Sequence, residues 1–225
     1  MHRTAAAIAM LASIALVSCG DGNGGSGPGS ATGDWLPLEV GGQWDYTAQG
    51  WLKVPSEEDT FDITGDVDQV VVSLVQHSDG FDVYRIETYT ELVVHLPDSN
   101  FVDTDTSRIY ACNTETEFRA YDDTLTSTYE TVLRYPLSEG DSWQPYPDST
   151  SVTRKVLSIT ASVSVPAGSY SDCARLRDTD SEEDSIYAER YMAPGTGMVK
   201  QVMKGFDPAD SVSTYVEIDL TGYSG

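Results

Sequence analysis

The sequence predicts an all-β domain built on one strongly curved antiparallel sheet, a half-barrel or open barrel, with few or no helices. Downstream of residue 33, β-branched and aromatic side chains recur at alternate positions, whereas helical periodicity is nearly absent. Turn sequences at 77–80, 97–100 and 205–208 separate several apolar runs at hairpin-like intervals. Because there are no helices to cover a flat sheet, we expect so many strands to curl or close.

The expected strands follow one another along the chain. In the two clearest, residues 157–165 and 212–220, apolar and polar side chains alternate, so that one face packs in the core and the other meets water. The apolar faces consist of Leu157, Ile159, Ala161, Val163 and Val165 in the first strand and Val212, Thr214, Val216, Ile218 and Leu220 in the second. The other expected strands are residues 44–49, 70–76, 81–94, 108–112, 129–135, 174–178, 186–192 and 198–204.

The first residues are typical of an export signal. Residues 1–4 are short and basic, and the apolar run 5–17 is too short to span a bilayer. The run ends at Leu-Val-Ser-Cys19-Gly20, which resembles the bacterial lipobox, in which cleavage precedes the cysteine and a diacylglycerol is attached to its sulfur. We therefore expect residues 1–18 to be a signal peptide and Cys19 to be the lipid attachment site. An ordinary cleavage site beside a chance cysteine is the alternative.

The segment after Cys19 predicts a flexible tether, because its Gly-, Ser- and Asp-rich composition can bury almost nothing. Residues 19–33 would hold a domain on the order of 20 Å from the membrane. Gly20 in place of an aspartate favours the outer membrane by resemblance to enterobacterial sorting signals. Residues 34–225 are long enough for one sizeable core.

The charge of the chain excludes several kinds of partner. The full sequence has a formal net charge of −23, and loss of Arg3 with the signal makes it −24. A chain this acidic is repelled by phosphate backbones and by anionic lipid surfaces. We therefore expect no nucleic-acid partner, and we expect membrane contact to come from the lipid anchor.

An internal repeat is the most informative local pattern. The sequence P-L-x-x-G-x-x-W occurs at 37–44 and again at 136–143, and it divides the domain into halves 34–132 and 133–225. We interpret it as a turn in which proline fixes φ, glycine takes a conformation denied to other residues and tryptophan enters the core. The alternative is that the two tryptophans form a ligand-stacking platform. The repeated positions are Pro37, Leu38, Gly41 and Trp44, and Pro136, Leu137, Gly140 and Trp143.

Three motifs in order resemble a broad group of poorly characterised bacterial lipoproteins. They are the double PLxxGxxW element, the VPAGxYxxC segment at 165–173 and the YxAPGxGxVK segment at 191–200. The resemblance spans about residues 35–204 and implies a curved antiparallel sheet, similar to the half-barrels of lipoprotein carriers of the LolA/LolB type. It supplies no catalytic residues. Those carriers plug the concave face with helices, for which this sequence offers little material.

Two cysteines remain after processing, Cys112 and Cys173, in a compartment that permits disulfides. A bridge between them and two free buried thiols are both open at this stage.

The sequence contains no visible catalytic apparatus. It has no G-x-S-x-G, no H-E-x-x-H, no C-x-x-C and no phosphate-binding loop, and His77 and His95 are expected to be ordinary strand-end histidines. Acidic segments at 66–68, 103–105 and 178–184 offer oxygen ligands to calcium but lack the EF-hand pattern, so solvated loops are the stronger interpretation. We therefore expect no metal or other cofactor, with calcium as a weak possibility.

These observations predict a non-enzymatic lipoprotein of the cell envelope, whose curved sheet binds an apolar small molecule or an envelope protein. An apolar cavity of roughly 300 Å³ or more would favour the small molecule. A scaffold or interaction module with a filled core is the alternative. The least favoured alternative is a carboxylate-based hydrolase, which would need a cleft where Asp or Glu side chains of raised pKa converge.

Overall fold

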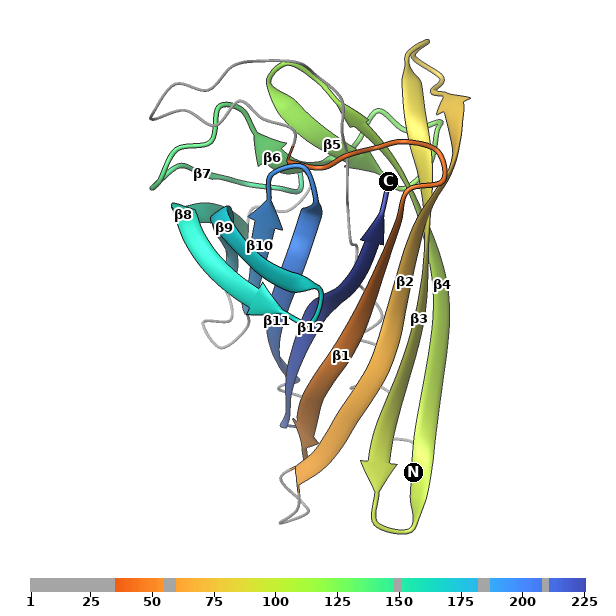
Figure 1. The fold of residues 1–225 in the computed structure, drawn as a ribbon, viewed down its shortest axis with the longest axis vertical. Helices are drawn as coiled ribbons and strands as arrows, with labels where there is room; N and C mark the ends of the chain where they lie inside the picture. Colours follow the sequence, from red (N-terminus) through yellow and green to blue (C-terminus); the bar gives the residue numbers. More distant parts are fainter. Residues whose placement is uncertain (1–34, 55–59, 148–150, 182–186, 208–210) are drawn as a thin grey trace.

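Twelve antiparallel strands form one sheet in the computed structural model, which describes residues 35–54, 60–147, 151–181, 187–207 and 211–225 (Figure 1). The strands are β1 (Gln43–Lys53), β2 (Thr60–Gln76), β3 (Asp82–Leu96), β4 (Ser99–Asn113), β5 (Glu117–Tyr121), β6 (Glu130–Arg134), β7 (Ser142–Trp143), β8 (Val152–Val165), β9 (Gly168–Asp180), β10 (Tyr187–Ala193), β11 (Gly197–Asp207) and β12 (Val212–Ser224). The described residues contain no helix, and hence none that could cross a membrane. The predicted all-β, curved and open sheet is confirmed.

The order of strands across the sheet is β6-β5-β4-β3-β2-β1-β12-β11-β10-β9-β8-β7. Each strand therefore lies beside its neighbours in sequence, except that β6 and β7 lie at opposite edges of the sheet. In addition, the first strand pairs with the last in the middle of the sheet.

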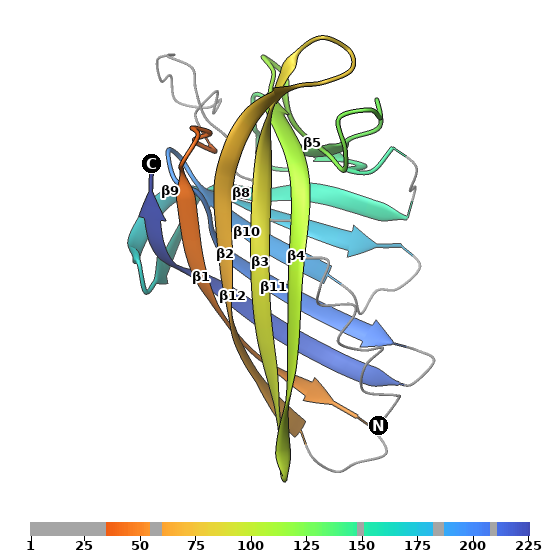
Figure 2. The same ribbon diagram turned by 90° about the vertical axis from the view of Figure 1, so that its right-hand side faces the viewer.

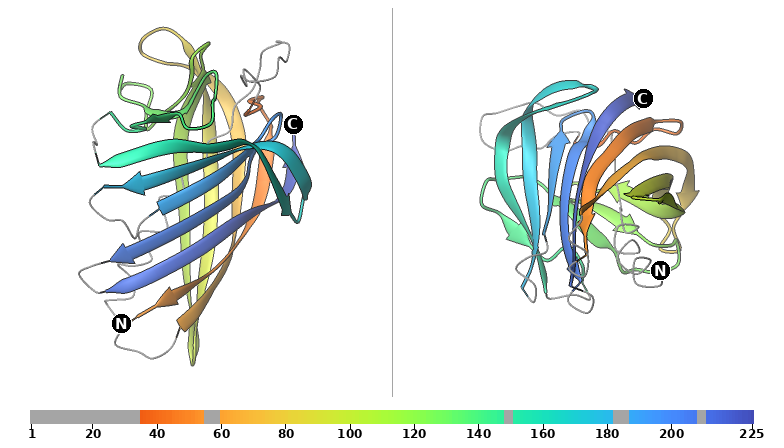
Figure 3. Two further views of the ribbon diagram at one scale, coloured as in Figure 1. Left: turned by 90° about the vertical axis from the view of Figure 1, so that its left-hand side faces the viewer. Right: turned by 90° about the horizontal axis from the view of Figure 1, so that it is seen from below.

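The sheet turns back on itself at the β1–β12 pair and forms two layers. The long strands β1–β4 make one layer, and β8–β12 cross behind them at a steep angle (Figure 2). Seen from below, the layers splay apart from this junction (Figure 3). The inner faces of both layers are therefore turned toward each other, which is what buries the apolar side of each strand.

One continuous hydrophobic cluster fills the space between the layers. It includes Val67 and Ile86 from the long strands and Leu176, Val199 and Ile218 from the opposite layer, each at most 1% exposed. The middle of the sheet is therefore packed with its own side chains. Any ligand cavity must lie at its margins.

Several strands are longer than the sequence patterns predict. β2 begins at Thr60 rather than 70, and β4 begins at Ser99 rather than 108. The added segments are rich in Asp and Thr, a composition that usually indicates loops. In β2 the Asp residues take outward positions, whereas in β4 Asp103 and Asp105 pair with the buried Leu92 and Thr90 and are themselves partly exposed. The short strands β5 and β7 have no sequence signal of their own.

The alternation of β12 is confirmed, because Val212, Thr214, Val216, Ile218 and Leu220 are all buried. In β8 the prediction needs one correction. The register shifts between Val156 and Ser158, so the alternation changes phase there. Val156 is fully buried in the core and Leu157 is only half-buried outside the cluster, whereas the partly buried residues from Ile159 to Val165 pack against it as expected.

Both copies of the repeat form the same turn. Gly41 and Gly140 have φ of +95° and +92°, and their amides donate to the carbonyls of Val71 and Val156 at 2.8 and 2.9 Å. An added Cβ would meet nothing within 4 Å at either glycine, so the positive φ alone explains the residue. Each tryptophan is buried, Trp44 at 0% and Trp143 at 5% exposure. The turn interpretation is confirmed, and exposed stacking platforms at these positions are ruled out.

Cys112 and Cys173 are free and buried. They lie on β4 and β9, with six strands between these two in the sheet, and they belong to separate hydrophobic clusters. The structure therefore contains two buried thiols rather than the bridge that the sequence left open.

Candidate functional site: a polar seam and the pocket beside it

The two edges of the sheet meet along a seam between β6 and the segment that follows β7. The amide of Thr131 donates to the carbonyl of Pro145 at 2.8 Å, and the indole Nε1 of Trp143 donates to the carbonyl of Thr131 at 2.8 Å. No strand ladder joins β6 to β7. Side chains therefore supply much of the bonding that a continuous sheet would take from backbone pairs.

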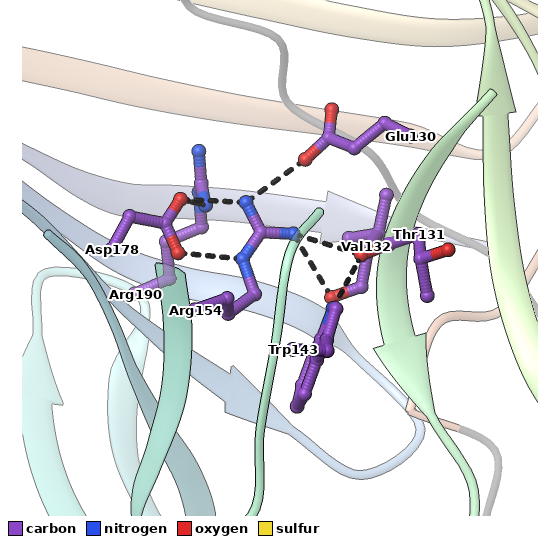
Figure 4. Close-up of polar contacts among 7 residues, drawn as sticks. All are labelled: Glu130, Thr131, Val132, Trp143, Arg154, Asp178 and Arg190. Atoms are coloured by element: carbon purple, nitrogen blue, oxygen red, sulfur yellow. Dashed lines mark hydrogen bonds and ion pairs between the residues drawn. The ribbon is translucent and has the colours of Figure 1, made fainter. Parts of the chain in front are cut away.

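A fully buried arginine stands at the centre of this seam (Figure 4). Arg154 extends from β8 and donates through Nε and Nη2 to the two carboxylate oxygens of Asp178, both at 2.6 Å. Its Nη1 donates to the carbonyl of Val132 on β6 at 3.0 Å, and Nη2 lies 2.9 Å from the carboxylate of Glu130. One guanidinium therefore holds β8, β9 and β6 together.

The positive and negative charges of this cluster balance each other. Arg190 on β10 donates through Nη1 to Asp178 at 2.8 Å, so that two guanidinium groups face the carboxylates of Asp178 and Glu130. Burial alone would raise the pKa of Asp178, but the charges of Arg154 and Arg190 outweigh it and lower that pKa to about 2. Burial likewise acts to lower the pKa of Arg154, and Asp178 and Glu130 raise it instead. Asp178 and Arg154 therefore stay charged at neutral pH.

A pocket of about 290 Å³ opens beside this cluster, where the inner faces of β8–β12 reach the ends of their strands. The register places its inner-face residues on adjacent strands, because Val152 pairs with Asp180, Ala188 with Met203, and Gly205 with Thr214. Its apolar wall is formed by Val152, Ala188, Met203 and Thr214 with Gly205. Its polar lining consists of Asp178, Thr179, Asp180, Tyr187, Arg190, Gln201 and Lys204.

Tyr146 covers the pocket from the opposite side of the seam. It directly follows Pro145, whose carbonyl accepts the bond from Thr131, so the closed seam positions this ring. Burial and the nearby carboxylate of Glu130 raise the pKa of Tyr146, and the hydroxyl therefore stays protonated. Tyr146 also lines a second hollow of about 260 Å³.

Gln201 is the one pocket residue with an unmet bonding requirement among those described. It is 2% exposed, and its Oε1 has no hydrogen-bond partner. An amide oxygen left unpaired in a buried wall is costly, and such atoms in native structures call for an explanation. A ligand that donates a hydrogen bond would provide one.

A wider hollow of about 560 Å³ lies near Trp143 and Arg134. Among the described residues that line it, none leaves a buried polar atom unpaired. Glu117, which lines it, is paired with Arg119 on β5 at 2.9 Å. The smaller pocket is therefore the stronger candidate.

The histidines have structural partners. His77 is buried against Phe81, and its Nε2 lies 3.0 Å from the carbonyl oxygen of Thr126. His95 contacts the hydroxyl of Thr64 at 2.8 Å. Neither lies among the residues of the pocket.

The acidic segments were the expected calcium ligands. Among the described residues, no group of three or more His, Cys, Asp or Glu is placed to hold a metal ion. Part of the segment 178–184 lies outside the described residues, and Cys19 and the tether lie outside them as well. Calcium binding and lipidation stay predictions.

Sequence reasoning did not identify the seam or the pocket. A signal was nevertheless present, because Arg154, Asp178, Arg190 and Gln201 each fall on the apolar phase of a strand. Arg154, for example, stands between Val152 and Val156. A charged residue in phase with a buried face indicates a paired interior charge, but its partners depend on which strands become neighbours.

Comparison with known proteins gives little help. No protein-family model and no curated protein matches the chain. Similar solved structures include an exported protein with a YmcC-like fold from Bacteroides fragilis, at 12% identity and a TM-score of 0.42, and a lipoprotein from Parabacteroides distasonis, at 13% and 0.41. Each covers 84% of this chain and 98% of its own. Likeness at this level assigns no function, and the relation to lipoprotein carriers stays a prediction.

Proposed function

We propose that this protein is a non-enzymatic lipoprotein of the cell envelope that binds a small molecule in the pocket between Tyr146 and the ends of β8–β12. The observation that carries the proposal is the buried, unpaired Oε1 of Gln201 in the wall of a preformed cavity. The volume of about 290 Å³ is near the lower end of the range for small-molecule sites. The ligand is therefore smaller than a lipid, and it binds at the margin of a filled sheet rather than across its concave face.

The arrangement of charges favours binding over catalysis. The one pocket carboxylate at the centre of the cluster, Asp178, has a pKa lowered to about 2 and is held by two arginines. General acid catalysis by a carboxyl group needs a raised pKa. Asp178 is therefore suited to shaping a rigid polar wall.

The envelope location rests on the N-terminal sequence. Cys19 would carry the lipid, Gly20 favours the outer membrane, and residues 19–33 would keep the domain clear of the headgroups. Cys19→Ala should abolish lipid labelling and release the protein from the membrane fraction. An unchanged, lipid-labelled membrane fraction from this variant would refute the anchor.

The pocket is tested with three probes that share one ring, namely cyclohexylamine, cyclohexanol and cyclohexanecarboxylate. We expect at least one to shift the amide resonances of Ala188, Gln201 and Met203 in the detergent-solubilised protein, with empty micelles titrated in parallel. Ala188→Phe should fill the cavity and abolish the shifts. Absence of shifts from all three probes, or shifts that survive Ala188→Phe, would contradict the proposal.

A second candidate function is supported by the edge of β4. Residues 99–109 pair with β3 only, because β5 covers β4 from Tyr110 onward. An exposed edge of this length invites addition of a strand from a partner protein, and Val102 on it is 52% exposed. A photocrosslinker at Val102 should then give a discrete adduct in cells, whereas one at Leu74, 47% exposed on β2, should not. Equal labelling at both positions would remove this candidate.

A further inference from the structure

The balance of charge in the pocket and the hydrogen bond that its wall lacks indicate what kind of molecule it takes. Both features belong to the site of the proposed function, so the inference rests on that function and narrows it to one ligand class.

The described lining of the pocket carries no net formal charge. The carboxylates of Asp178 and Asp180 are matched in number by the cationic side chains of Arg190 and Lys204. Asp178 accepts from Nη1 of Arg190 at 2.8 Å, and Asp180 accepts from the hydroxyl of Ser151 at 3.4 Å. An ion of either sign therefore meets like charges as well as opposite ones, and it gives up its hydration on entry. This lining favours an uncharged ligand.

Lys204 is the exposed member of this set of charges. It lies on β11 between Met203 and Gly205, and its ammonium is 5.7 Å from the ring centroid of Tyr187. An ammonium that stays in contact with water attracts an anion only weakly, because water and salt screen it. Lys204 therefore does not turn the pocket into an anion site.

The bond that the wall lacks is one donated to Gln201. This side chain is 2% exposed, and its Oε1 has no partner among the described residues. On the neighbouring strands Gln201 pairs with Arg190 and Ile218. The side chain of Ile218 has no donor, and Nη1 of Arg190 is directed at Asp178. The oxygen is therefore matched by a donor on a molecule in the pocket.

The rest of the inner wall suits a hydrocarbon body. Val152, Ala188 and Met203 form an apolar surface, and Tyr146 adds an aromatic ring. The flexible thioether of a methionine packs against irregular apolar shapes. A compact apolar group therefore fits beside the amide of Gln201.

We propose that the pocket binds an uncharged small molecule that combines a hydroxyl group with a compact hydrocarbon body. The hydroxyl donates its hydrogen to Oε1 of Gln201, and the hydrocarbon contacts Val152, Met203 and the ring of Tyr146. A buried amide oxygen that gains a donor recovers free energy that it lost on leaving water. The site therefore prefers a ligand that donates a hydrogen bond to one that only accepts.

Two ring probes of nearly equal size test the donated bond. Cyclohexanol donates and accepts, whereas cyclohexanone only accepts. We expect cyclohexanol to bind about fivefold or more tightly than cyclohexanone, as followed by the amide resonances of Ala188 and Met203 in the detergent-solubilised protein. Empty micelles titrated in parallel correct for uptake by detergent. Equal affinities would mean that water serves Oε1 and would overturn the proposed bond.

The two charged probes test the uncharged class. Cyclohexylamine and cyclohexanecarboxylate should each bind at least fivefold more weakly than cyclohexanol at an ionic strength of about 0.5 M, which screens general attraction to the acidic chain. Tighter binding of either ion would overturn the uncharged class while leaving the pocket in place. No binding of any of the four probes would overturn the proposed function, and the ligand class with it.

Gln201→Met removes the buried oxygen and keeps an unbranched side chain of similar length. The preference for cyclohexanol over cyclohexanone should fall below twofold, because only the alcohol uses this oxygen. The control is Gln49→Met, which makes the same change at an exposed position of β1 and should leave the preference intact. A preference that stays at fivefold in a folded Gln201→Met would contradict the assigned role of the amide.

A measurement on the unaltered chain covers the case in which Gln201→Met does not fold, which thermal unfolding would show. The carbon resonance of the Gln201 side-chain carbonyl should shift on addition of cyclohexanol and much less on addition of cyclohexanone, because a donated hydrogen bond polarises the carbonyl. Equal shifts with the two probes would overturn the inference.

Discussion

The two copies of the repeat form the same turn in different surroundings. The first opens β1 in the middle of the sheet, between β2 and β12, and the indole of Trp44 donates to the carbonyl of Thr196 at 2.6 Å. The second opens β7 at the edge, and the indole of Trp143 donates across the seam to Thr131. The local sequence therefore sets the turn, while the neighbours decide whether it anchors a continuous ladder or joins two free edges.

The same difference extends to the charges. Near the first copy, Asp45, Asp66 and Asp68 lie on adjacent outward positions of β1 and β2, so like charges face each other. Beside the second copy, Arg154 is enclosed by Asp178 and Glu130. The outward Asp residues of β1 and β2 tolerate repulsion because water screens their charges. Arg154 needs carboxylate partners because it is buried away from water.

Truncation of the tryptophans should give the largest effects on stability. Trp44→Ala and Trp143→Ala should each lower the free energy of unfolding by about 3–5 kcal/mol, through loss of the ring and the cavity left behind. Trp44 also stacks on Tyr223 with centroids 5.3 Å apart, so its loss should be at the upper end. Chemical denaturation measures both values. A cost below about 1 kcal/mol for Trp143→Ala would break the equivalence of the two copies.

Removal of the seam arginine, Arg154, should have the next largest effect on the free energy of unfolding. Arg154→Met leaves two buried carboxylates facing one remaining arginine, and we expect a loss of about 3–5 kcal/mol. The matched control is Arg175→Met on the outer face, where a side chain 37% exposed donates to Glu189 at 2.8 Å. Arg175 is partly exposed and Glu189 keeps Arg177 as a second partner, so this change should cost less than about 1 kcal/mol. Similar costs for the two variants would mean that the seam is no drier than the surface.

Acid should have opposite effects on the two regions. The pKa of Asp178 lies below its ordinary value of 3.8, at about 2, so its contribution is present above pH 3.8 and is lost as the pH falls toward 2. The difference corresponds to about 2 kcal/mol. Unfolding measured between pH 5 and 2 should show this loss, and Asp178→Asn should flatten the slope. An unchanged slope in a folded Asp178→Asn would contradict the assignment.

Asp68 should show the reverse sign beside the first copy. Burial and the charges of Asp45 and Asp66 raise its pKa, so protonation is favoured in the folded state and stability is gained as the pH falls through that raised value. Asp68→Asn should therefore raise the melting temperature slightly at pH 7. A lower melting temperature would contradict the interpretation of repulsion.

The glycines should give smaller and equal effects. Gly41→Val and Gly140→Val place a β-branched residue at positive φ, at a cost of about 1–3 kcal/mol each. Because an added Cβ meets nothing within 4 Å, Gly→Asn at either position should be better tolerated than Gly→Val. Unequal costs in the two copies would mean that one turn is held by its neighbours rather than by its own backbone.

The thiols should give no effect on stability. Cys112 and Cys173 are free, so reducing agent should leave the melting temperature unchanged. Titration of the denatured, non-reduced protein should find both thiols reactive. If neither thiol reacts until a reducing agent is added, the two cysteines are bridged in the cell envelope.

Much of the fold follows from the sequence, and the reason is local. Alternation in β12 and the turns at Gly41 and Gly140 depend on residues close in the chain. The Asp-rich start of β2 was missed, although Phe61, Ile63 and Val67 alternate there, because acidic composition masked the pattern. The bulge after Val156 in β8 has no sequence signal, and it displaced Leu157 from the core.

The candidate site was harder to predict because it is not local. Arg154, Asp178 and Arg190 come from three strands, and Glu130 comes from the opposite edge of the sheet. Each residue on its own is an ordinary strand residue. Only the curl that brings β6 to β8 makes them a cluster, and curvature is a property of the whole sheet.

The central claim is that side chains close the seam and thereby build the pocket wall at Tyr146. Native-state hydrogen exchange tests it through two amides, Thr131, which donates to Pro145 across the seam, and Val71, which donates to Gly42 beside the first copy. In Arg154→Met, protection of Thr131 should fall at least tenfold relative to Val71, whereas a loss of global stability alone would lower the protection of amides that exchange through global unfolding by the same factor. An unchanged ratio would show that the backbone alone holds the seam and would contradict the claim.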